Sequence, residues 1–566
     1  FLQNRIDLAI SDYSKAIEIN PNGDALYYYN RGIAYAHKCD FHYAISDFSR
    51  AIEIEPNKPI FYYNRGLAYS ENNNLEASIE DYNKAIELGP GFFAAYNNRA
   101  IAFLQKNDFD SAISDFDMAI QLKPGFVIAY NNRGSAHLKN NAPDLAISDF
   151  NKAIEIDPNI ADSYYNRGNT YLYRNELESA IADYNKAIQI NPHYSEAYNN
   201  RGAVYLKNYN LDAAITDMSR VIELKPNDPI AYHNRGRAYF NKDDMDSAIS
   251  DFNEAIKINP DNAEIYRERG NAYLNNGDFE HAIADFDSAV AINPNDSTAY
   301  YYRGIAHLNR NELAPGFYNN DLDKAIANLS KALDINPKDS KAYYNRGEAY
   351  LFKNDLDSAI TNYTKSIEID PYYSEAFNSR GKAYALKGDF DAALLDFNKA
   401  IELQPDNWAA KRNRETALID RGINYDKQQK YELAIQDYNR VIEYNPNNAS
   451  VFNSRGNTYF ALHNYELALS DYNRAIEIDP YFSEAYYNRG NLFYSMEDYI
   501  SASDNFTNAI NLGDKDDVTY HKRGISYLNQ GLKDLALTDF QIILEKTNNQ
   551  DLKQEVRQLI EIIESQ

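Results

Sequence analysis

The sequence is poor in the residues that cross-link a chain or carry it through a membrane. Only one of its 566 residues is cysteine, Cys39, so no disulfide can form within the chain and cysteine usage leaves the redox compartment open. No stretch approaches the 18 uncharged apolar residues typical of a spanning helix, and no signal-peptide pattern stands at the start. Phe1 falls inside what should be a repeat's first helix. We therefore expect that the natural N-terminus, with any targeting signal, is missing.

Positive charge is also scarce. The chain has 57 lysines and arginines against 83 acidic residues, which gives a net charge of −26. Phosphate binding requires clustered cations, so we expect no nucleic-acid partner. The compartment stays undetermined: the cytoplasm is slightly favoured, and a periplasmic or extracellular location stays open.

Catalytic signatures are sparse as well. The nine histidines are dispersed, and the chain contains no HExxH, Walker or GxSxG motif. His37, Cys39 and His42 gather in one expected turn, but three scattered candidates make a weak metal site. We predict no metal, no cofactor and no enzymatic activity.

What the sequence has in abundance is one motif of 34 residues, which the stretch 161–194 shows most clearly. Tyr164, Gly168 and Tyr171 stand at i, i+4 and i+7, and Ala180, Tyr184 and Ala187 continue a second stripe of helical period. Asn175 and Glu176 break the pattern between the two stripes, and Pro192 ends the second helix. The unit is therefore a helical hairpin. An arginine, followed by glycine in all but one case, marks fifteen full units: Arg31, Arg65, Arg99, Arg133, Arg167, Arg201, Arg235, Arg269, Arg303, Arg346, Arg380, Arg421, Arg455, Arg489 and Arg523.

This unit closely resembles the tetratricopeptide repeat (TPR), a helix-turn-helix module with the same residue types at the same spacings. The resemblance covers nearly all of the chain. It implies an all-α, right-handed superhelical solenoid of about fifteen full repeats, with an N-terminal half repeat and a C-terminal capping helix. It also implies a binding scaffold, although TPR arrays serve many unrelated partners.

The spacing of the arginines predicts how the chain is divided. Nine extra residues before Arg346 fall at 312–320 and read as a loop, either a tolerated insertion or a docking loop carrying Phe317 and Tyr318. Seven extra residues before Arg421 predict one lengthened helix and a local change in superhelical geometry. The expected parts are a half repeat at 1–24, repeats at 25–407, repeats at 408–549 that begin with the lengthened helix at 408–427, and a capping helix at 550–566.

The residue before the arginine is asparagine in nine of the fifteen units, and by the resemblance these first helices line the concave surface. A row of amides can pair with the N–H and C=O groups of an extended peptide. The row resembles the asparagine ladder in the TPR arm of O-linked N-acetylglucosamine transferases. The alternative is that the amides only solvate a polar inner wall. The predicted peptide track comprises Asn30, Asn64, Asn98, Asn132, Asn166, Asn200 and Asn234, with Tyr29, Tyr63 and Tyr165 beside them.

The arginines themselves could form an anion ladder, but the second helices carry an equally regular acid. One arginine against one aspartate per unit predicts a structural ladder of ion pairs between helices. Its members include Arg65, Arg99, Arg133 and Arg167, with Asp47, Asp81, Asp115 and Asp149. The sequons at Asn295 and Asn448 lie in loops between units and could accept glycan if the chain is secreted.

The leading functional hypothesis is a non-enzymatic scaffold that binds an extended peptide segment in its concave groove. A second hypothesis is a self-assembling scaffold or filament whose subunits stack head to tail, because the incomplete first unit leaves an apolar face open. A third makes the chain the substrate-recruiting arm of a larger enzyme such as a glycosyltransferase. The sequence does not name the partner or the oligomeric state.

Overall fold

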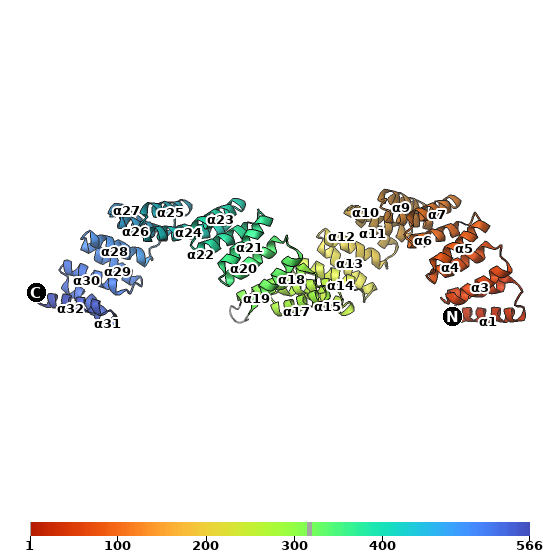
Figure 1. Ribbon diagram of the computed structural model, residues 1–566, viewed down its shortest axis with the longest axis horizontal. Helices are drawn as coiled ribbons and strands as arrows, with labels where there is room; N and C mark the ends of the chain where they lie inside the picture. The colour runs from red at the N-terminus through yellow and green to blue at the C-terminus, as the bar shows by residue number, and fades with distance from the viewer. Residues whose placement is uncertain (1, 314–319, 566) are drawn as a thin grey trace. The chain divides into compact units, whose positions relative to one another are not determined.

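The computed structural model describes residues 2–313 and 320–565, with side chains from residue 5 onward. Most of the predicted loop at 312–320, including Phe317 and Tyr318, lies outside these residues. The described residues form 32 α-helices and no strand (Figure 1). The fold is an all-α TPR-type solenoid, as the repeat pattern predicts. The chain separates into two compact units at Ile292 and Asn293, unit 1 and unit 2 below.

Unit 1 holds one unpaired helix followed by eight hairpins, in which each even-numbered helix is the first of its hairpin and the next odd-numbered helix is the second. Its helices are α1 Leu2–Ile19, α2 Ala25–His37, α3 Phe41–Ile54, α4 Pro59–Glu71, α5 Leu75–Leu88, α6 Phe93–Gln105, α7 Phe109–Leu122, α8 Val127–Lys139, α9 Pro143–Ile156, α10 Ala161–Tyr173, α11 Leu177–Ile190, α12 Ser195–Lys207, α13 Leu211–Leu224, α14 Pro229–Asn241, α15 Met245–Ile258, α16 Ala263–Asn275 and α17 Phe279–Ile292.

Unit 2 holds seven hairpins and a final helix. Its helices are α18 Ser297–Leu313, α19 Asp321–Ile335, α20 Ser340–Phe352, α21 Leu356–Ile369, α22 Ser374–Leu386, α23 Phe390–Leu403, α24 Trp408–Lys427, α25 Tyr431–Tyr444, α26 Ala449–Ala461, α27 Tyr465–Ile478, α28 Ser483–Ser495, α29 Tyr499–Asn511, α30 Asp517–Asn529, α31 Lys533–Lys546 and α32 Gln550–Ser565.

Each hairpin closes around one glycine and one aromatic ring. A Cβ built on Gly168 would lie 2.8 Å from the Tyr184 ring, which is fully buried. The small residue therefore lets the two helices approach closely. The packing energy gained offsets the poor helix propensity of glycine. Ala180 and Ala187 line the same core and are also fully buried.

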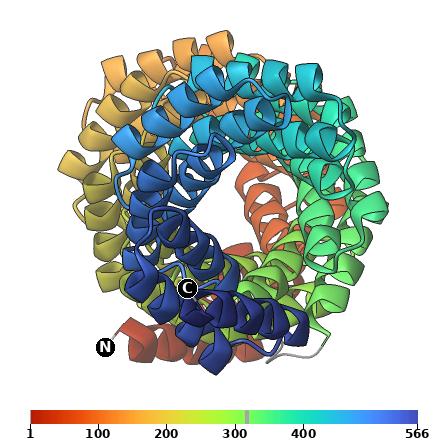
Figure 2. The ribbon, with the colours of Figure 1, turned by 90° about the vertical axis from the view of Figure 1, so that its left-hand side faces the viewer.

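The first helices of the hairpins lie on the inner side of a curve within each unit. Neighbouring first helices touch one another throughout unit 1, as α2 and α4 or α12 and α14 do, whereas neighbouring second helices of the described chain stay further apart. Figure 2 shows the resulting inner and outer layers of helices. The inner face of unit 1 is therefore built from its first helices.

The turn inside most hairpins contains a residue in the left-handed region. Asn73, Asn107 and Asn175 have φ of 58°, 60° and 61°, and Gly277 has φ of 77°. Asparagine and glycine accept this conformation at low cost, which explains why the helical pattern breaks there. Glu497, with φ of 62°, occupies the same turn position in unit 2.

The last helix closes the core of unit 2. Val556 and Ile563 of α32 are buried against Phe540 and Ile543 of α31, and Leu559 packs beside them. The charged residues of α32 face away from this cluster, so the helix ends the apolar core with a polar surface, as a terminal cap does.

Candidate functional site

In unit 1 the arginine of each hairpin forms a two-bonded ion pair with the aspartate 16 positions later. Arg65 Nε and Nη2 donate to the two carboxylate oxygens of Asp81, both at 2.7 Å. The aspartate side chain is 7% exposed and the arginine side chain 20% exposed. The same pairing joins Arg31 with Asp47, Arg99 with Asp115, Arg133 with Asp149, Arg167 with Asp183, Arg201 with Asp217, Arg235 with Asp251 and Arg269 with Asp285.

The arginine also makes a contact with the preceding hairpin, which sequence reasoning missed. Arg65 Nη1 also donates to Ser49 Oγ at 3.0 Å, on the second helix of the preceding hairpin. Arg99 reaches Asn83 and Arg167 reaches Asn151 in the same way. One side chain thus joins three helices, and we call this set of contacts the arginine staple. Its sequence signal is a short hydrogen-bonding residue two positions after each aspartate.

The ion pairs hold these arginines between the two helices of each hairpin. The Asp183 carboxylate raises the pKa of Arg167, as expected for a guanidinium held by a buried counter-charge. Such a pair contributes more to helix register than to net stability, because desolvation offsets most of the attraction. The arginines are therefore not available as an anion ladder on the inner face.

Unit 2 replaces the aspartate with asparagine in three hairpins. Arg489 Nε donates to Asn505 Oδ1 at 2.8 Å, and Asn505 Nδ2 donates to the Ser501 carbonyl at 2.7 Å. Without a carboxylate beside it, burial lowers the pKa of Arg489. Asn328 and Asn362 accept from Arg303 and Arg346 in the same manner. All three asparagines belong to sequons, and their amides are held inside the helix pair.

The long helix α24 carries two arginines seven residues apart, and both contact the preceding hairpin. Arg414 donates to Asn398 of the preceding hairpin, and its guanidinium carbon lies 3.8 Å from the centre of the Tyr444 ring. Arg421 pairs with Asp437 of its own hairpin and also donates to Asp391 of the preceding hairpin. Asn413 Nδ2 donates to Asn378 Oδ1 at 2.9 Å. The first part of α24 thus docks on the hairpin before it, and the last part opens the next hairpin.

Four of the seven asparagines of the predicted track are bonded to the preceding hairpin. Asn64 Nδ2 donates to the Tyr29 hydroxyl at 3.0 Å, and Asn98 Nδ2 donates to the Tyr63 hydroxyl at 2.9 Å. Burial raises the pKa of Tyr29 and of Tyr63. In the same way Asn132 donates to Asn97 Oδ1 and Asn200 donates to the Tyr165 hydroxyl. These four amides link neighbouring first helices. Asn64 and Asn200 use both of their N–H donors, and the Asn98 oxygen also accepts from Asn97.

The other three asparagines of the track are Asn30, Asn166 and Asn234. Their side chains are half-buried and form no hydrogen bond to any other described residue. Each amide can therefore donate and accept at the same time. Asn131 and Asn199, on the helices preceding Asn166 and Asn234, each have a buried Oδ1 without a partner in the described chain.

Two cavities on the inner face of unit 1 lie next to each other. One, of about 300 Å³, is lined by α12 and α14 and includes Lys207, Asn234 and Arg237. The other, of about 180 Å³, lies between α14, α15 and α16. They share Arg237 and Asn241. Sequence reasoning did not identify these cavities, because they depend on the side chains of two or three hairpins at once.

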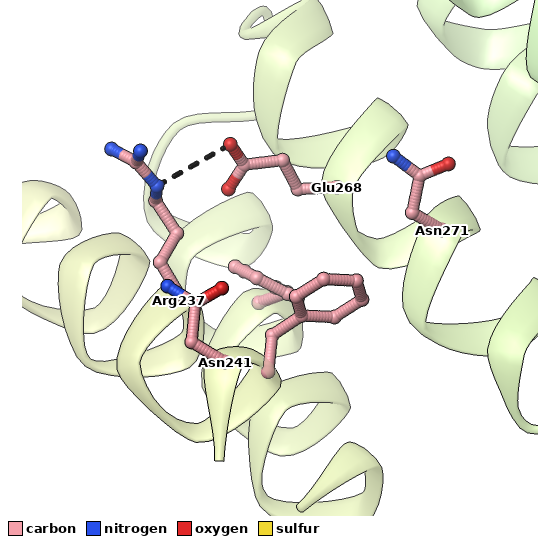
Figure 3. Close-up of a pocket in the computed structure, with 6 residues that line it drawn as sticks. Arg237, Asn241, Glu268 and Asn271 are labelled. Carbon is pink, nitrogen blue, oxygen red and sulfur yellow. Dashed lines mark ion pairs between the residues drawn. The ribbon is translucent and has the colours of Figure 1, made fainter. Parts of the chain in front are cut away.

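Figure 3 shows the smaller cavity, with Arg237 and Glu268 pointing toward each other and Asn241 and Asn271 to either side. Arg237 Nε lies 3.5 Å from Glu268 Oε1, and the other carboxylate oxygen lies 2.8 Å from His233 Nε2. Glu268 stands where most hairpins have asparagine, so here a charged contact replaces the amide link to the preceding hairpin.

The remaining sequence candidates lie elsewhere. Cys39 is exposed, and no group of three or more His, Cys, Asp or Glu side chains within the described residues is placed to hold a metal ion. Asn295 is exposed, whereas the Asn448 side chain caps α26 by accepting from the Val451 N–H. None of the helices in the described part of the chain combines the length and apolar character needed to cross a membrane.

Comparison with sequence families gives a consistent result along the chain. Profiles described as TPR repeat match residues 168–208, 236–277, 317–353, 424–463 and 456–497. Profiles described as tetratricopeptide repeat match residues 25–58, 63–125, 127–160, 150–182, 195–228, 263–296, 340–373 and 374–407. Together the matches cover well over half of the sequence. No curated protein sequence matches the chain.

Several solved structures are similar to parts of the chain. YrrB, described as a TPR protein with an unusual peptide-binding site, is 23% identical with a TM-score of 0.30, over 35% of this chain and 97% of YrrB. MamA from Desulfovibrio magneticus RS-1 is 23% identical with a TM-score of 0.29, over 32% of this chain and 97% of MamA. Part of a TPR repeat-containing protein from Cytophaga hutchinsonii is 20% identical with a TM-score of 0.39, over 45% and 98% of the two chains.

Proposed function

The chain belongs to the tetratricopeptide repeat proteins, which are protein-protein interaction scaffolds. We propose that the inner face of unit 1 binds an extended segment of another protein without catalysing a reaction. The observation that carries this proposal is the set of uncommitted amides on that face. Asn166 and Asn234 can each donate and accept, and the donor-bonded Asn200 between them still presents an acceptor. An extended backbone offers the complementary N–H and C=O groups along its length.

The charge on this face also suits a neutral polypeptide. The arginines are bound by aspartates of the second helices, and Glu268 is matched by His233 and Arg237. These paired charges offer a strongly charged guest no unpaired partner of opposite sign among them. A peptide backbone is uncharged and can bind through hydrogen bonds alone.

The test uses a peptide selected from a phage-displayed library of random twelve-residue sequences against the full chain. Changing Asn166 and Asn234 together to Ala removes two amides that make no internal bond. We expect affinity to fall by roughly tenfold to a hundredfold, because each neutral hydrogen bond contributes about 1 kcal/mol. Fluorescence anisotropy with labelled peptide measures the change.

The matched control changes Asn345 and Asn488 to Ala, at the same position on first helices of unit 2. These amides bond to Tyr301 and Asn453, so the control should lower thermal stability slightly and leave affinity unchanged. Equal affinity for the wild type and the Asn166, Asn234 variant, or failure of the library to yield any binder, would refute the groove proposal.

A further inference from the structure

We propose that the cavity between α14, α15 and α16 is an anchor pocket for one uncharged apolar side chain, aliphatic or aromatic, of the bound segment. This inference rests on the proposed groove and adds the chemical class that the groove selects. Its lining comprises Phe240, Phe252, Arg237, Asn241, Glu268 and Asn271.

The size of the cavity fits a side chain. Its volume of about 180 Å³ equals the share of roughly six water molecules in the liquid. Pockets for free small molecules usually measure about 300–1,000 Å³. The cavity is therefore too small for most free ligands and large enough for one side chain presented by a backbone outside it.

The apolar lining favours such a guest. Phe252 is fully buried and Phe240 is half-buried, and both contribute to the cavity wall. Phe252 forms the closed floor, and an apolar side chain that enters would exchange water for contact with the accessible ring of Phe240, which is the main favourable term in burying apolar groups.

The charged groups at the cavity discriminate against charged guests. Glu268 is held by His233 at 2.8 Å and faces Arg237 at 3.5 Å, so both signs of charge are already matched. A lysine of the guest would be desolvated and would compete with Arg237 for the Glu268 carboxylate. A glutamate would be desolvated beside that carboxylate and could reach only the half-exposed Arg237. An uncharged side chain leaves this arrangement intact.

The position of the cavity connects it with the track. Asn234 lines the neighbouring cavity, which shares Arg237 and Asn241 with the anchor pocket. Asn271, whose Oδ1 is buried without a hydrogen-bond partner in the described chain, lines the anchor pocket on α16, the next first helix after α14. A segment whose backbone is bound at Asn234 therefore reaches the anchor pocket on the next helix.

The experiment scans the library-selected peptide described above against the full chain. Each peptide position is replaced in turn by Leu, Phe, Lys and Glu, and affinity is measured by fluorescence anisotropy. We expect one position at which Lys and Glu weaken binding at least tenfold relative to Leu or Phe. That preference should disappear in Asn271→Phe, which fills the pocket, and in Asn241→Trp, which alters its exposed wall without touching the core.

Asn491→Phe is the matched control, since Asn491 has the same position on α28 of unit 2 as Asn271 on α16. It should preserve the preference. A charged residue preferred at the decisive position, no apolar preference at any position, or a preference unchanged in both pocket variants would overturn the anchor pocket. If the Asn166, Asn234 variant still weakens binding in that case, the groove stands and only the pocket fails.

Discussion

Units 1 and 2 are built from the same hairpin, but the residue opposite the arginine varies more in unit 2. All eight arginines in the hairpins of unit 1 face an aspartate, whereas three of the seven in unit 2 face an asparagine. The helices still pack in the same way, and the asparagine amide supplies one acceptor while its N–H₂ group bonds back to its own helix. The position thus requires a hydrogen-bond acceptor of that length, and a full charge is an addition to this requirement.

The two units also differ in which residues hold the stack together and which belong to the proposed binding site. The half-buried arginines are committed to the staple in both units, so they define the stack. The uncommitted amides and the two adjacent cavities described above lie on the inner face of unit 1. The strictly spaced unit therefore carries the proposed site, and uniform stacking would hold its amides in a regular row.

The largest loss of stability should come from removing the side chain that accepts from the arginine, in one hairpin of each unit. Asp115→Ala leaves the Arg99 guanidinium, whose side chain is 18% exposed, without its counter-charge. We expect a loss of about 3 kcal/mol in local stability. Asn505→Ala removes only a neutral acceptor and should cost about 1–2 kcal/mol.

Amide hydrogen exchange in α6, α7, α28 and α29 measures both losses, because a long array does not unfold in two states. Peptides from α10 and α11 serve as the internal reference. Equal losses at the two sites would mean that the charge adds nothing to the acceptor.

Exchanging the two residue types should give smaller effects of opposite sign. Asp115→Asn keeps one acceptor for Arg99 and should destabilise unit 1 by about 1 kcal/mol. Asn505→Asp gives Arg489 a counter-charge and should stabilise unit 2 by up to about 1 kcal/mol. Urea unfolding followed by hydrogen exchange tests both. Destabilisation by Asn505→Asp would show that α28 and α29 cannot accommodate a carboxylate.

Unit 2 should also respond to acid through a buried histidine. His307 is 5% exposed and its ring lies 3.0 Å from Asp321, with Arg310 beside it. Burial lowers the pKa of His307 below its ordinary value of 6.5. Because the unfolded chain then binds the proton more readily, this contribution is complete above pH 6.5 and is lost as pH falls through the lowered pKa.

Hydrogen exchange of α18 and α19 at pH 7 and pH 5, corrected for intrinsic rates, measures this loss. His307→Gln should flatten the pH dependence, and α10 with α11, which contain no histidine, should not change. Greater protection of α18 and α19 at pH 5 would contradict the assignment.

The smallest effects concern the turns. Glu497→Gly in unit 2 relieves a side chain from φ of 62°, and should stabilise its hairpin by about 0.5 kcal/mol after the entropy of glycine is subtracted. Gly277→Ala in unit 1 places a side chain at φ of 77° and should cost about 1 kcal/mol. Thermal melting compares the two. A loss of stability on Glu497→Gly would indicate that the glutamate makes a compensating contact.

The sequence reveals the hairpins because each depends on local periodicity. Gly168 and Tyr184 stand 16 residues apart within one unit, and helical spacing alone brings them together. The second contact of the arginine staple was missed because it crosses to the preceding hairpin. The geometry of this contact depends on how hairpins stack, and the helical period of 3.6 residues carries no information about that stacking.

The same limit explains the asparagine track. An asparagine and the hydroxyl that accepts its hydrogen bond, such as Asn64 and Tyr29, are 35 residues apart and meet only through stacking. The sequence therefore identifies the row but does not distinguish bonded amides from uncommitted ones. The anchor pocket depends on side chains from three helices and has no signature in a single repeat.

The lengthened helix α24 shows how such an array can gain residues without losing its stacking. Seven residues turn a helix by nearly two full revolutions, so an insertion of that size brings the next arginine back to nearly the same side. An insertion of five residues would turn it by about 140° and remove it from its aspartate. Evolution or design can therefore lengthen a first helix by two turns and keep the arginine of the next hairpin opposite its aspartate, as Arg421 stays opposite Asp437.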